Sequence, residues 1–389
     1  MPTSNPSLCI ITTVAGSVKA FYRGQIEALN KAGFKTTVAC AYDAELASQL
    51  SAETDYVPVN FSRVISPLKD VIALWQLFRL FRKSKFDIVQ YSTPKAALIA
   101  SIAAFMARIP TRIYILWGLY YTGRRGLGRF VLKSFEKTIC SLSTHIVPIA
   151  HEMIAFVESE GLAPAAKCEV MLNGSAKGVD LQLFDPDKWR DAGRHVRIKY
   201  NIPPEAVVIG TMARLTKDKG ICELVTAFEK LARDIQTVHL LIVGEQETKD
   251  RLPQDIEQII TDHPRIYAVG RQNMPVPYFA AMDIFCLPTY REGFGEVNLE
   301  AQAMKLPVVS TNIIGPRESV VNGQTGFLVE PRNSEALIPP LRTLILDASL
   351  RRQMGDKARK RVEQMFDHKD MIEAVVRHRR KLISDEVKK

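Results

Sequence analysis

Short apolar runs alternate with helical patterns along the first half of the chain. The run Leu8–Val14 is followed by a helical pattern over Ala20–Ala32 that ends at Gly33, and glycine commonly terminates helices. Further apolar runs, separated by helical stretches, are Thr36–Cys40, Ile88–Tyr91, Arg112–Leu116 and His145–Ile149. This alternation predicts a parallel sheet covered by helices on both faces.

The same alternation resumes after a turn-rich passage, Asn173–Pro186. The expected strands of the second half are Val207–Met212, His239–Val243, Arg265–Ala268, Ile284–Leu287, Val308–Ser310 and Gly326–Val329. The expected helices are Gly220–Arg233, Glu296–Met304, Glu335–Phe366 and Met371–Ser384. The pattern predicts two doubly wound α/β domains facing each other across a cleft. We place them at residues 1–178 and 179–370, and expect 371–389 to form a helix that packs back toward the first domain.

The composition fits two folded domains. The chain has 389 residues, of which 47% are hydrophobic and 24% charged, so it is neither a single small module nor a disordered chain. Its six cysteines are scattered without a C-x-x-C pair. We therefore expect a reducing compartment, no disulfide framework and no structural zinc.

No targeting or membrane-spanning segment is expected. Leu8–Val14 is too short for a secretory signal and lacks a basic flank. The longest apolar run, Ala96–Ala107, has 12 residues, whereas a spanning helix needs about 20. These features predict a cytoplasmic protein.

The net charge of +10 is concentrated in one part of the chain. Residues 63–137 contain 14 Lys/Arg against three acids. Over Arg63–Lys85 the bases alternate with apolar residues that include Trp75, Phe78 and Phe81, which predicts a basic amphipathic helix. Such a helix lies in an anionic membrane interface, or it packs on the core and leaves a solvated basic face. A second basic aromatic stretch at 120–133 favours the membrane, and no DNA or RNA motif accompanies the charge.

Candidate chemistry begins where the strand Ile284–Leu287 runs into a Gly293-x-Gly295 loop and a helix. The N–H groups at such a helix start suit a diphosphate. Glu292 and Glu300 flank this loop, and carboxylates would accept hydrogen bonds from sugar or ribose hydroxyls rather than bind phosphate. The dinucleotide-binding fingerprint of oxidoreductases is disfavoured, because Asn298 replaces its third glycine and the loop comes late in its domain.

A second loop follows the strand Val207–Met212. It contains Arg214 and Lys219, five residues apart. A guanidinium can fork onto phosphate oxygens, and an ammonium can reach them as a point charge. A solvated basic loop is the alternative interpretation.

Together, these segments resemble the retaining glycosyltransferases of family 4. The matching motifs are Ala213-Arg214-Leu215-x-x-x-Lys219-Gly220, Glu292-Gly293-Phe294-Gly295-x-x-x-x-Glu300, Gly315-Pro316-x-Glu318 and Asn322-Gly323-x-Thr325-Gly326-Phe327-Leu328-Val329. The resemblance implies the GT-B architecture of two Rossmann-like domains. It also implies an acceptor-binding first domain, and a nucleotide-sugar bound in the second domain without a metal or other cofactor.

The resemblance also implies roles for single residues. Arg214 and Lys219 would hold the diphosphate and compensate its charge as it leaves, and Glu292, the third catalytic candidate, would contact the donor sugar. Glu300 would bind the ribose hydroxyls. The remaining donor-binding candidates lie in loops after strands: Gly16, Gly270, Arg271, Gly293, Phe294, Gly295 and Glu296.

The first half resembles members that act on polyprenyl-diphosphate-linked or capsular glycans. Ser17, Trp117 and Gly118 are the acceptor or cleft candidates. Many relatives have His-Gly where this chain has Trp117-Gly118, so the histidine contact to the donor sugar is missing. Tryptophan there is either a core residue or a platform on which a sugar stacks.

We therefore expect transfer of a hexose-type sugar from a nucleotide-sugar donor to a lipid-linked or growing surface saccharide. The expected donor is a UDP-sugar. The enzyme would be peripheral at the inner face of the membrane, and retention would proceed without a protein nucleophile. Two alternatives stay open. One is a nucleotide-sugar epimerase of the same architecture, and the other is a non-catalytic partner in a polysaccharide assembly complex.

Overall fold

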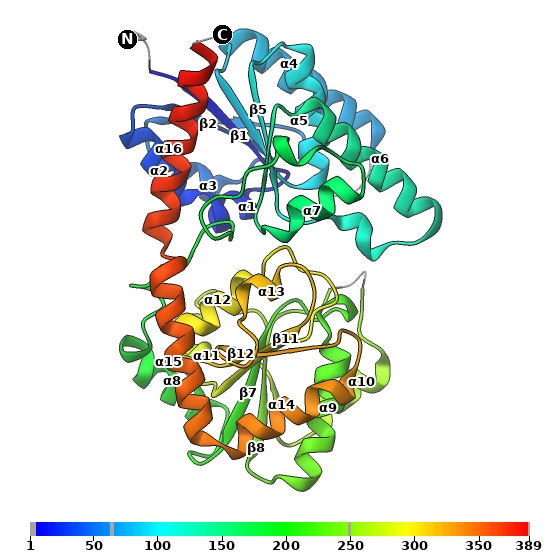
Figure 1. The fold of residues 1–389 in the computed structure, drawn as a ribbon, viewed down its shortest axis with the longest axis vertical. Coiled ribbons are helices and arrows are strands. Elements are labelled where there is room, and N and C mark those ends of the chain that lie inside the picture. The colour runs from blue at the N-terminus through cyan, green and yellow to red at the C-terminus, as the bar shows by residue number, and fades with distance from the viewer. Residues whose placement is uncertain (1–4, 63–65, 248–249, 388–389) are drawn as a thin grey trace. The chain divides into compact units, whose positions relative to one another are not determined.

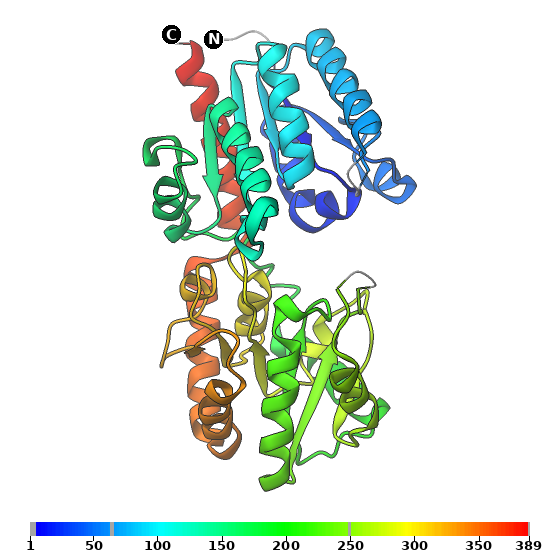
Figure 2. The same cartoon turned by 90° about the vertical axis from the view of Figure 1, so that its right-hand side faces the viewer.

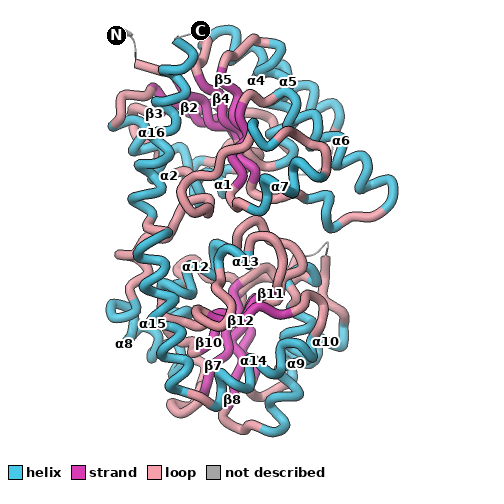
Figure 3. The backbone as a smooth tube through the Cα atoms, in the orientation of Figure 1, coloured by secondary structure: helices cyan, strands magenta, loops and turns pink. Residues whose placement is uncertain are grey.

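The computed structural model describes residues 5–62, 66–247 and 250–387. The chain forms two compact units, one of residues 1–177 with 369–389 and one of residues 178–368. Each unit contains a parallel sheet of six strands (Figures 1 and 3). The prediction of two Rossmann-like α/β domains is confirmed.

The sheet of the first unit has the order β3-β2-β1-β4-β5-β6. Its strands are β1 (Ser7–Ile11), β2 (Lys35–Cys40), β3 (Thr54–Pro58), β4 (Ile88–Tyr91), β5 (Thr111–Leu116) and β6 (His145–Pro148). The order reverses between β1 and β4, and ligands of open α/β sheets bind outside the carboxyl ends of the strands at such a reversal.

Helices cover both faces of this first sheet. They are α1 (Ala15–Phe21), α2 (Arg23–Lys31), α3 (Ala44–Gln49), α4 (Pro67–Ser84), α5 (Pro94–Met106), α6 (Gly126–Leu142), α7 (Glu152–Ser159) and α16 (His368–Val387), with 3-10 turns η1 (Tyr120–Gly123) and η2 (Ala165–Lys167). Figures 1 and 2 show α4, α5 and α6 together on one face, and Figure 1 shows α2 and α16 on the other. The helix α16 shares a core with the sheet, because its Met371, Val375 and Leu382 pack in one cluster with residues of β1 and β2.

Two elements near the N-terminus are present as predicted, but their predicted bounds are wrong. The strand expected to reach Val14 ends at Ile11, and the helix expected over Ala20–Ala32 begins at Ala15 and breaks at Tyr22. The Tyr22 side chain is buried and its hydroxyl donates to Ser92 Oγ at 3.0 Å. The residue at the break is therefore hydrogen-bonded to the residue that follows β4 (Ile88–Tyr91).

The basic amphipathic helix is α4, and residues 63–65, including Arg63, lie outside the described residues. One face packs inward through Ala73, Leu77 and Phe81. Of the three aromatic side chains predicted for a membrane surface, Trp75 is exposed and Phe81 is buried. The prediction is therefore wrong for Phe81, because this side chain belongs to the core.

The sheet of the second unit has the order β12-β11-β10-β7-β8-β9, which reverses between β7 and β10. Its strands are β7 (Val207–Met212), β8 (Val238–Val243), β9 (Ile266–Ala268), β10 (Ile284–Leu287), β11 (Val308–Thr311) and β12 (Gly326–Val329). Its helices are α8 (Pro186–Lys199), η3 (Lys217–Lys219), α9 (Ile221–Asp234), α10 (Gln254–Asp262), α11 (Val276–Phe279), α12 (Glu296–Ala303), α13 (Pro316–Ser319), α14 (Ser334–Leu346) and α15 (Ala348–Met365). Helices α9, α10 and α14 lie on one face of this sheet (Figure 1).

The two chain segments at the edge of the second unit are hydrogen-bonded to each other. The Val179 N–H donates to the Phe366 carbonyl at 2.8 Å, and the His368 N–H donates to the Val179 carbonyl at 3.0 Å. Gly178 has φ +67°, and a Cβ there would lie 2.9 Å from the backbone of His368. Glycine is therefore required where these segments meet.

Candidate active site

The loops after β7 and β10 meet at the reversal of strand order in the second unit. The Tyr290 N–H donates to the Asp218 carbonyl at 2.8 Å, and Thr289 Oγ1 donates to the same oxygen at 3.0 Å. Arg291 also pairs with the Asp218 carboxylate at 3.2 Å. One residue of the first loop thus receives three contacts from the second.

Gly220 permits this close approach. It has φ +71° at the start of α9, and a Cβ there would lie 2.0 Å from the carbonyl oxygen of Pro288. Any side chain at this position would push the two loops apart. The close approach of the two loops therefore explains why the motif has glycine directly after Lys219.

The structure brings together two of the three catalytic candidates. Lys219 Nζ lies 2.6 Å from Glu292 Oε2, and the two side chains are 16% and 23% exposed. Glu292 Oε1 also accepts from the Gly293 N–H at 3.2 Å. The pair fixes Glu292 at the entrance to the glycine loop, beside the cation proposed for a diphosphate.

Arg214, the third candidate, pairs with a carboxylate that the sequence did not single out. Its NH1 lies 2.7 Å from Glu247 Oε1, and both side chains are about half exposed. Partial burial lowers the pKa of Arg214, but the hydrogen bond and charge of Glu247, with the charges of Asp218 and Glu292, outweigh it and the net pKa is raised. Arg214 therefore stays charged and is oriented by Glu247.

The glycine loop is held from behind by packing. Phe294 is fully buried and its ring lies 5.6 Å from that of Phe366. Gly295 has φ +94° and begins α12. Asn298, in the position of the third fingerprint glycine, is buried and donates to Ser319 Oγ at 3.1 Å. Phe294 thus supports the loop from the core, whereas Glu296 and Glu300 are partly exposed on α12.

Gly270 and Arg271 lie in the loop after β9, at the same edge of the sheet. The Gly244 N–H, after β8, donates to the Gly270 carbonyl at 3.0 Å, and the Leu215 N–H donates to the Glu245 carbonyl at 2.9 Å. The loops after β7, β8 and β9 are therefore bonded in series. Every donor candidate of the second half lies at the carboxyl edge of one sheet.

Sequence reasoning missed a tyrosine that anchors the loop after β10. The Tyr290 hydroxyl donates to Glu223 Oε1 on α9, and the Arg332 guanidinium lies 4.7 Å from the centre of the Tyr290 ring. Tyr290 lies two residues before Glu292, but no local sequence pattern indicates Glu223 or Arg332 as its partners.

The candidates of the first unit follow β1 and β5. Gly16 and Ser17 lie in the first turn of α1, and Trp117 and Gly118 follow β5. The Trp117 ring lies 4.4 Å from Phe21 and 5.6 Å from Tyr22. Trp117 is therefore packed against α1 and its junction with α2, and it is half-buried.

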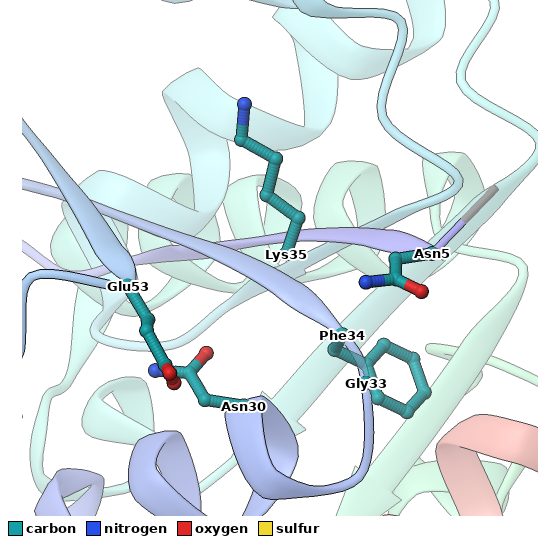
Figure 4. A pocket seen from close by; sticks show the side chains of 6 residues that line it. All are labelled: Asn5, Asn30, Gly33, Phe34, Lys35 and Glu53. Atoms are coloured by element: carbon teal, nitrogen blue, oxygen red, sulfur yellow. The ribbon is translucent and has the colours of Figure 1, made fainter.

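A shallow hollow of about 690 Å³ lies at the opposite edge of the first sheet. Its walls come from Asn5 before β1, the turn before β2, and Glu53 before β3, and in Figure 4 Lys35 points away from Asn30 and Glu53. The amino ends of the strands lie there, so we do not include it in the site.

Among the described residues, no group of three or more His, Cys, Asp or Glu side chains could hold a metal ion. No helix within the same residues is long and apolar enough to cross a membrane.

Comparison with known proteins identifies the family. Residues 194–361 match the model of glycosyl transferases group 1, and residues 16–174 match that of the glycosyl transferase 4-like domain. A capsular polysaccharide biosynthesis glycosyltransferase, CapM of Staphylococcus aureus, is 34% identical, and the alignment covers 93% of each chain. The chain belongs to the family 4 glycosyltransferases.

Other similar proteins extend this result. This glycosyltransferase is 26% identical over 88% of each chain to the Escherichia coli enzyme named UDP-Gal:alpha-D-GlcNAc-diphosphoundecaprenol alpha-1,3-galactosyltransferase. The chain is similar to the crystal structure of Anabaena Alr3699/HepE in complex with UDP, with 19% sequence identity and a TM-score of 0.77. The alignment covers 97% of this chain and 100% of that one. A glycosyltransferase from Rickettsia africae is 22% identical, with the same TM-score over 98% and 99%. These neighbours confirm the GT-B fold.

Proposed function

We propose that this enzyme transfers a hexose-type sugar from a UDP-linked donor to a lipid-linked or growing surface saccharide, with retention at the anomeric carbon. The observation that carries the proposal is the partly buried pair of Lys219 and Glu292 at the carboxyl edge of the second sheet, with Arg214 in the adjoining loop. The site combines cations for a diphosphate with a carboxylate for sugar hydroxyls.

The geometry supports a mechanism based on charge exchange. Both cations are paired with carboxylates, Lys219 with Glu292 and Arg214 with Glu247. A donor diphosphate replaces these carboxylates as the partner of the cations, and Glu292 then turns to the hydroxyls of the sugar. As the glycosidic bond breaks, charge develops on the diphosphate and the two cations stabilise it. The leaving oxygen accepts the acceptor proton on the face that the acceptor attacks, so no protein nucleophile is needed.

The named relatives support the donor and acceptor classes. CapM is named for capsular polysaccharide biosynthesis, and the E. coli relative for a UDP-Gal donor and a diphosphoundecaprenol-linked acceptor. We propose a UDP donor and a lipid-linked or capsular-type acceptor for this chain on that basis. The reaction is proposed to need no metal, since Arg214 and Lys219 supply the positive charge.

The acceptor class leads us to propose attachment to an anionic membrane surface at the cytoplasmic face. Helix α4 exposes Leu68, Val71, Ile72 and Trp75, which lie along one face because their spacing is helical. Helix α6 exposes a second group beside basic residues, with Leu127 78% and Phe130 70% exposed. Both helices begin where strands of the first sheet end, so these groups lie near the carboxyl edge of that sheet.

A transfer assay tests the proposed function. Purified protein is incubated with UDP-sugars and an undecaprenyl-diphosphate-linked saccharide, and the product is identified by mass and its anomeric configuration by NMR. We expect extension of the acceptor by one hexose with retained configuration. Epimerised donor without transfer would support the epimerase instead. If no UDP-sugar supported either transfer or donor hydrolysis, catalysis of this kind would be refuted.

A further inference from the structure

A charged side chain lies in the core of the first unit. Arg379 on α16 is 1% exposed, and its Nε and NH2 donate to Gln90 Oε1 on β4 at 2.9 and 2.6 Å. Its NH1 donates to Nδ1 of His378. Gln90 is itself buried, so α16 is joined to the sheet through a buried guanidinium.

No carboxylate among the described residues pairs with this guanidinium. Glu169 forms its close contact with His378, with Oε2 3.4 Å from Nε2; it is half exposed and acts on the pKa of Arg379 only through its charge, without an ion pair. Burial and the charge of Arg379 lower the pKa of His378 to about 2, so the imidazole between the two is neutral. Arg379 has five N–H donors, of which these contacts use three. A buried cation without a counter-charge is strongly unfavourable.

The guanidinium lines a small cavity of about 20 Å³. The other polar residues that line it are Tyr22, Gln25, Gln90 and Ser175, and Trp117 lines it as well. Among the residues that the structure describes, no acidic side chain lines this cavity. A single water-sized particle needs about 10–15 Å³ by this measure, so the cavity takes one small ion and is too small for a phosphate. All these walls belong to the first unit.

We propose that this cavity binds one halide-sized anion, chloride being the cellular example, as the counter-ion of Arg379. Water would fill the volume but would leave the charge uncompensated. The anion would receive the unused N–H groups of Arg379, with Gln25 and Ser175 as further donors. It would stabilise the docking of α16 against β4, close to Trp117. The inference does not depend on the transfer reaction.

The first test is the melting temperature of the full-length protein in sodium chloride, sodium bromide and sodium gluconate at equal ionic strength. Gluconate is too large for the cavity. Once the site fills, we expect a rise of about 3–5 °C for each tenfold increase in halide and none with gluconate. Arg379→Met should abolish the halide dependence, and the matched control Arg380→Gln, on the exposed side of α16, should keep it. Equal melting curves in halide and gluconate would overturn the proposal.

The second test does not require an Arg379 variant that folds. The chain has three tryptophans, so Trp75→Phe with Trp189→Phe leaves Trp117 as the only reporter. Bromide bound beside Trp117 should quench its fluorescence with saturation, and chloride should reverse the quenching by competition. Quenching that rises linearly with bromide and ignores chloride would show collision from solvent and refute a bound anion.

Discussion

Lys219 Nζ lies 2.6 Å from Glu292 Oε2, and each side chain is less than a quarter exposed. The pair joins the loop after β7 to the loop after β10, over 73 residues of sequence. In the proposed mechanism, the ammonium exchanges this carboxylate for the donor diphosphate.

Lys219→Ala is expected to lower kcat by about 10²–10³, because a group that stabilises developing charge is removed. Arg214→Ala should act similarly. Lys217→Ala is the matched control, since Lys217 is exposed in the same loop. Steady-state kinetics with donor and acceptor measure the effect, and activity within threefold of the unchanged enzyme for both variants would exclude the assigned role.

Glu292 and Glu300 are expected to act at different stages. Glu300→Gln should weaken UDP binding, because a contact to ribose acts equally in the ground and transition states. Glu292→Gln should mainly lower kcat, and it should leave UDP binding unchanged or tighter because Lys219 loses its competing carboxylate. UDP affinity from calorimetry and kcat from transfer assays separate the two. If both variants lost UDP affinity to the same degree, this division of roles would be wrong.

Chelation is expected to leave the transfer rate unchanged. In the proposed mechanism, Arg214 and Lys219 supply the charge that a divalent cation would otherwise supply. The measurement is the transfer rate after dialysis against EDTA, with and without added Mg²⁺ or Mn²⁺. A loss of activity that added metal restores would contradict the prediction.

Glu136 on α6 is expected to make the stability of the first unit depend on pH. It is buried, its Oε2 accepts from the Tyr114 hydroxyl at 2.9 Å, and burial raises its pKa to about 7. The folded state therefore holds a proton that the unfolded state releases near its ordinary pKa. Uptake of this proton stabilises the folded state relative to the unfolded state. The stabilisation is complete below the pKa of Glu136 in the unfolded chain and is lost as pH rises to about 7.

Glu136→Gln should remove this dependence, because the amide stays neutral. Near pH 8 the variant should be more stable than the unchanged protein by about 2–3 kcal/mol, and near pH 5 the difference should be small. Urea unfolding at both pH values measures it, with the exposed Glu53→Gln as control. Parallel stability curves for the two proteins would show that Glu136 is ionised in the fold.

The strands of the second unit show what the local pattern can specify. Val207–Met212, Ile284–Leu287 and Gly326–Val329 were predicted with their observed bounds. The strands β7 and β10 lie inside a parallel sheet, and buried strands read as continuous apolar runs between turn residues. The motif residues Arg214, Lys219 and Glu292 could be predicted for the same reason, since they lie in the loops that follow β7 and β10.

The features that could not be predicted from the sequence involve contacts between residues far apart in the chain. Tyr22, at the helix break, is hydrogen-bonded to Ser92, 70 residues away, and the partner of Arg214 is 33 residues away at Glu247. Both follow from strand order and register, which no local periodicity contains. The buried face of α4 could not be predicted from the sequence either. Apolar residues occur on all sides of this helix, and only packing decides which of them are buried.

Binding of the first unit to an anionic membrane is proposed to depend on the basic residues of α4. Arg79, Arg82, Lys83 and Lys85 are exposed at the C-terminal end of α4, and each base near an anionic surface contributes about 1 kcal/mol. Replacing all four by Gln should weaken binding to phosphatidylglycerol vesicles at least about tenfold. Replacing the exposed bases Lys188, Arg352, Lys357 and Lys360 of the second unit removes the same charge and should have little effect.

The apolar residues of α6 provide an independent arm of this experiment. Leu127→Ser with Phe130→Ser keeps the charge but removes two highly exposed apolar side chains, so binding should weaken at high as well as low salt. The α4 variant should differ from the unchanged protein mainly at low salt, because attraction between exposed charges is screened. Vesicle sedimentation across a salt series distinguishes the two effects. If the second-unit control weakens binding as much as the α4 variant, the attraction reflects net charge and these helices are not the membrane surface.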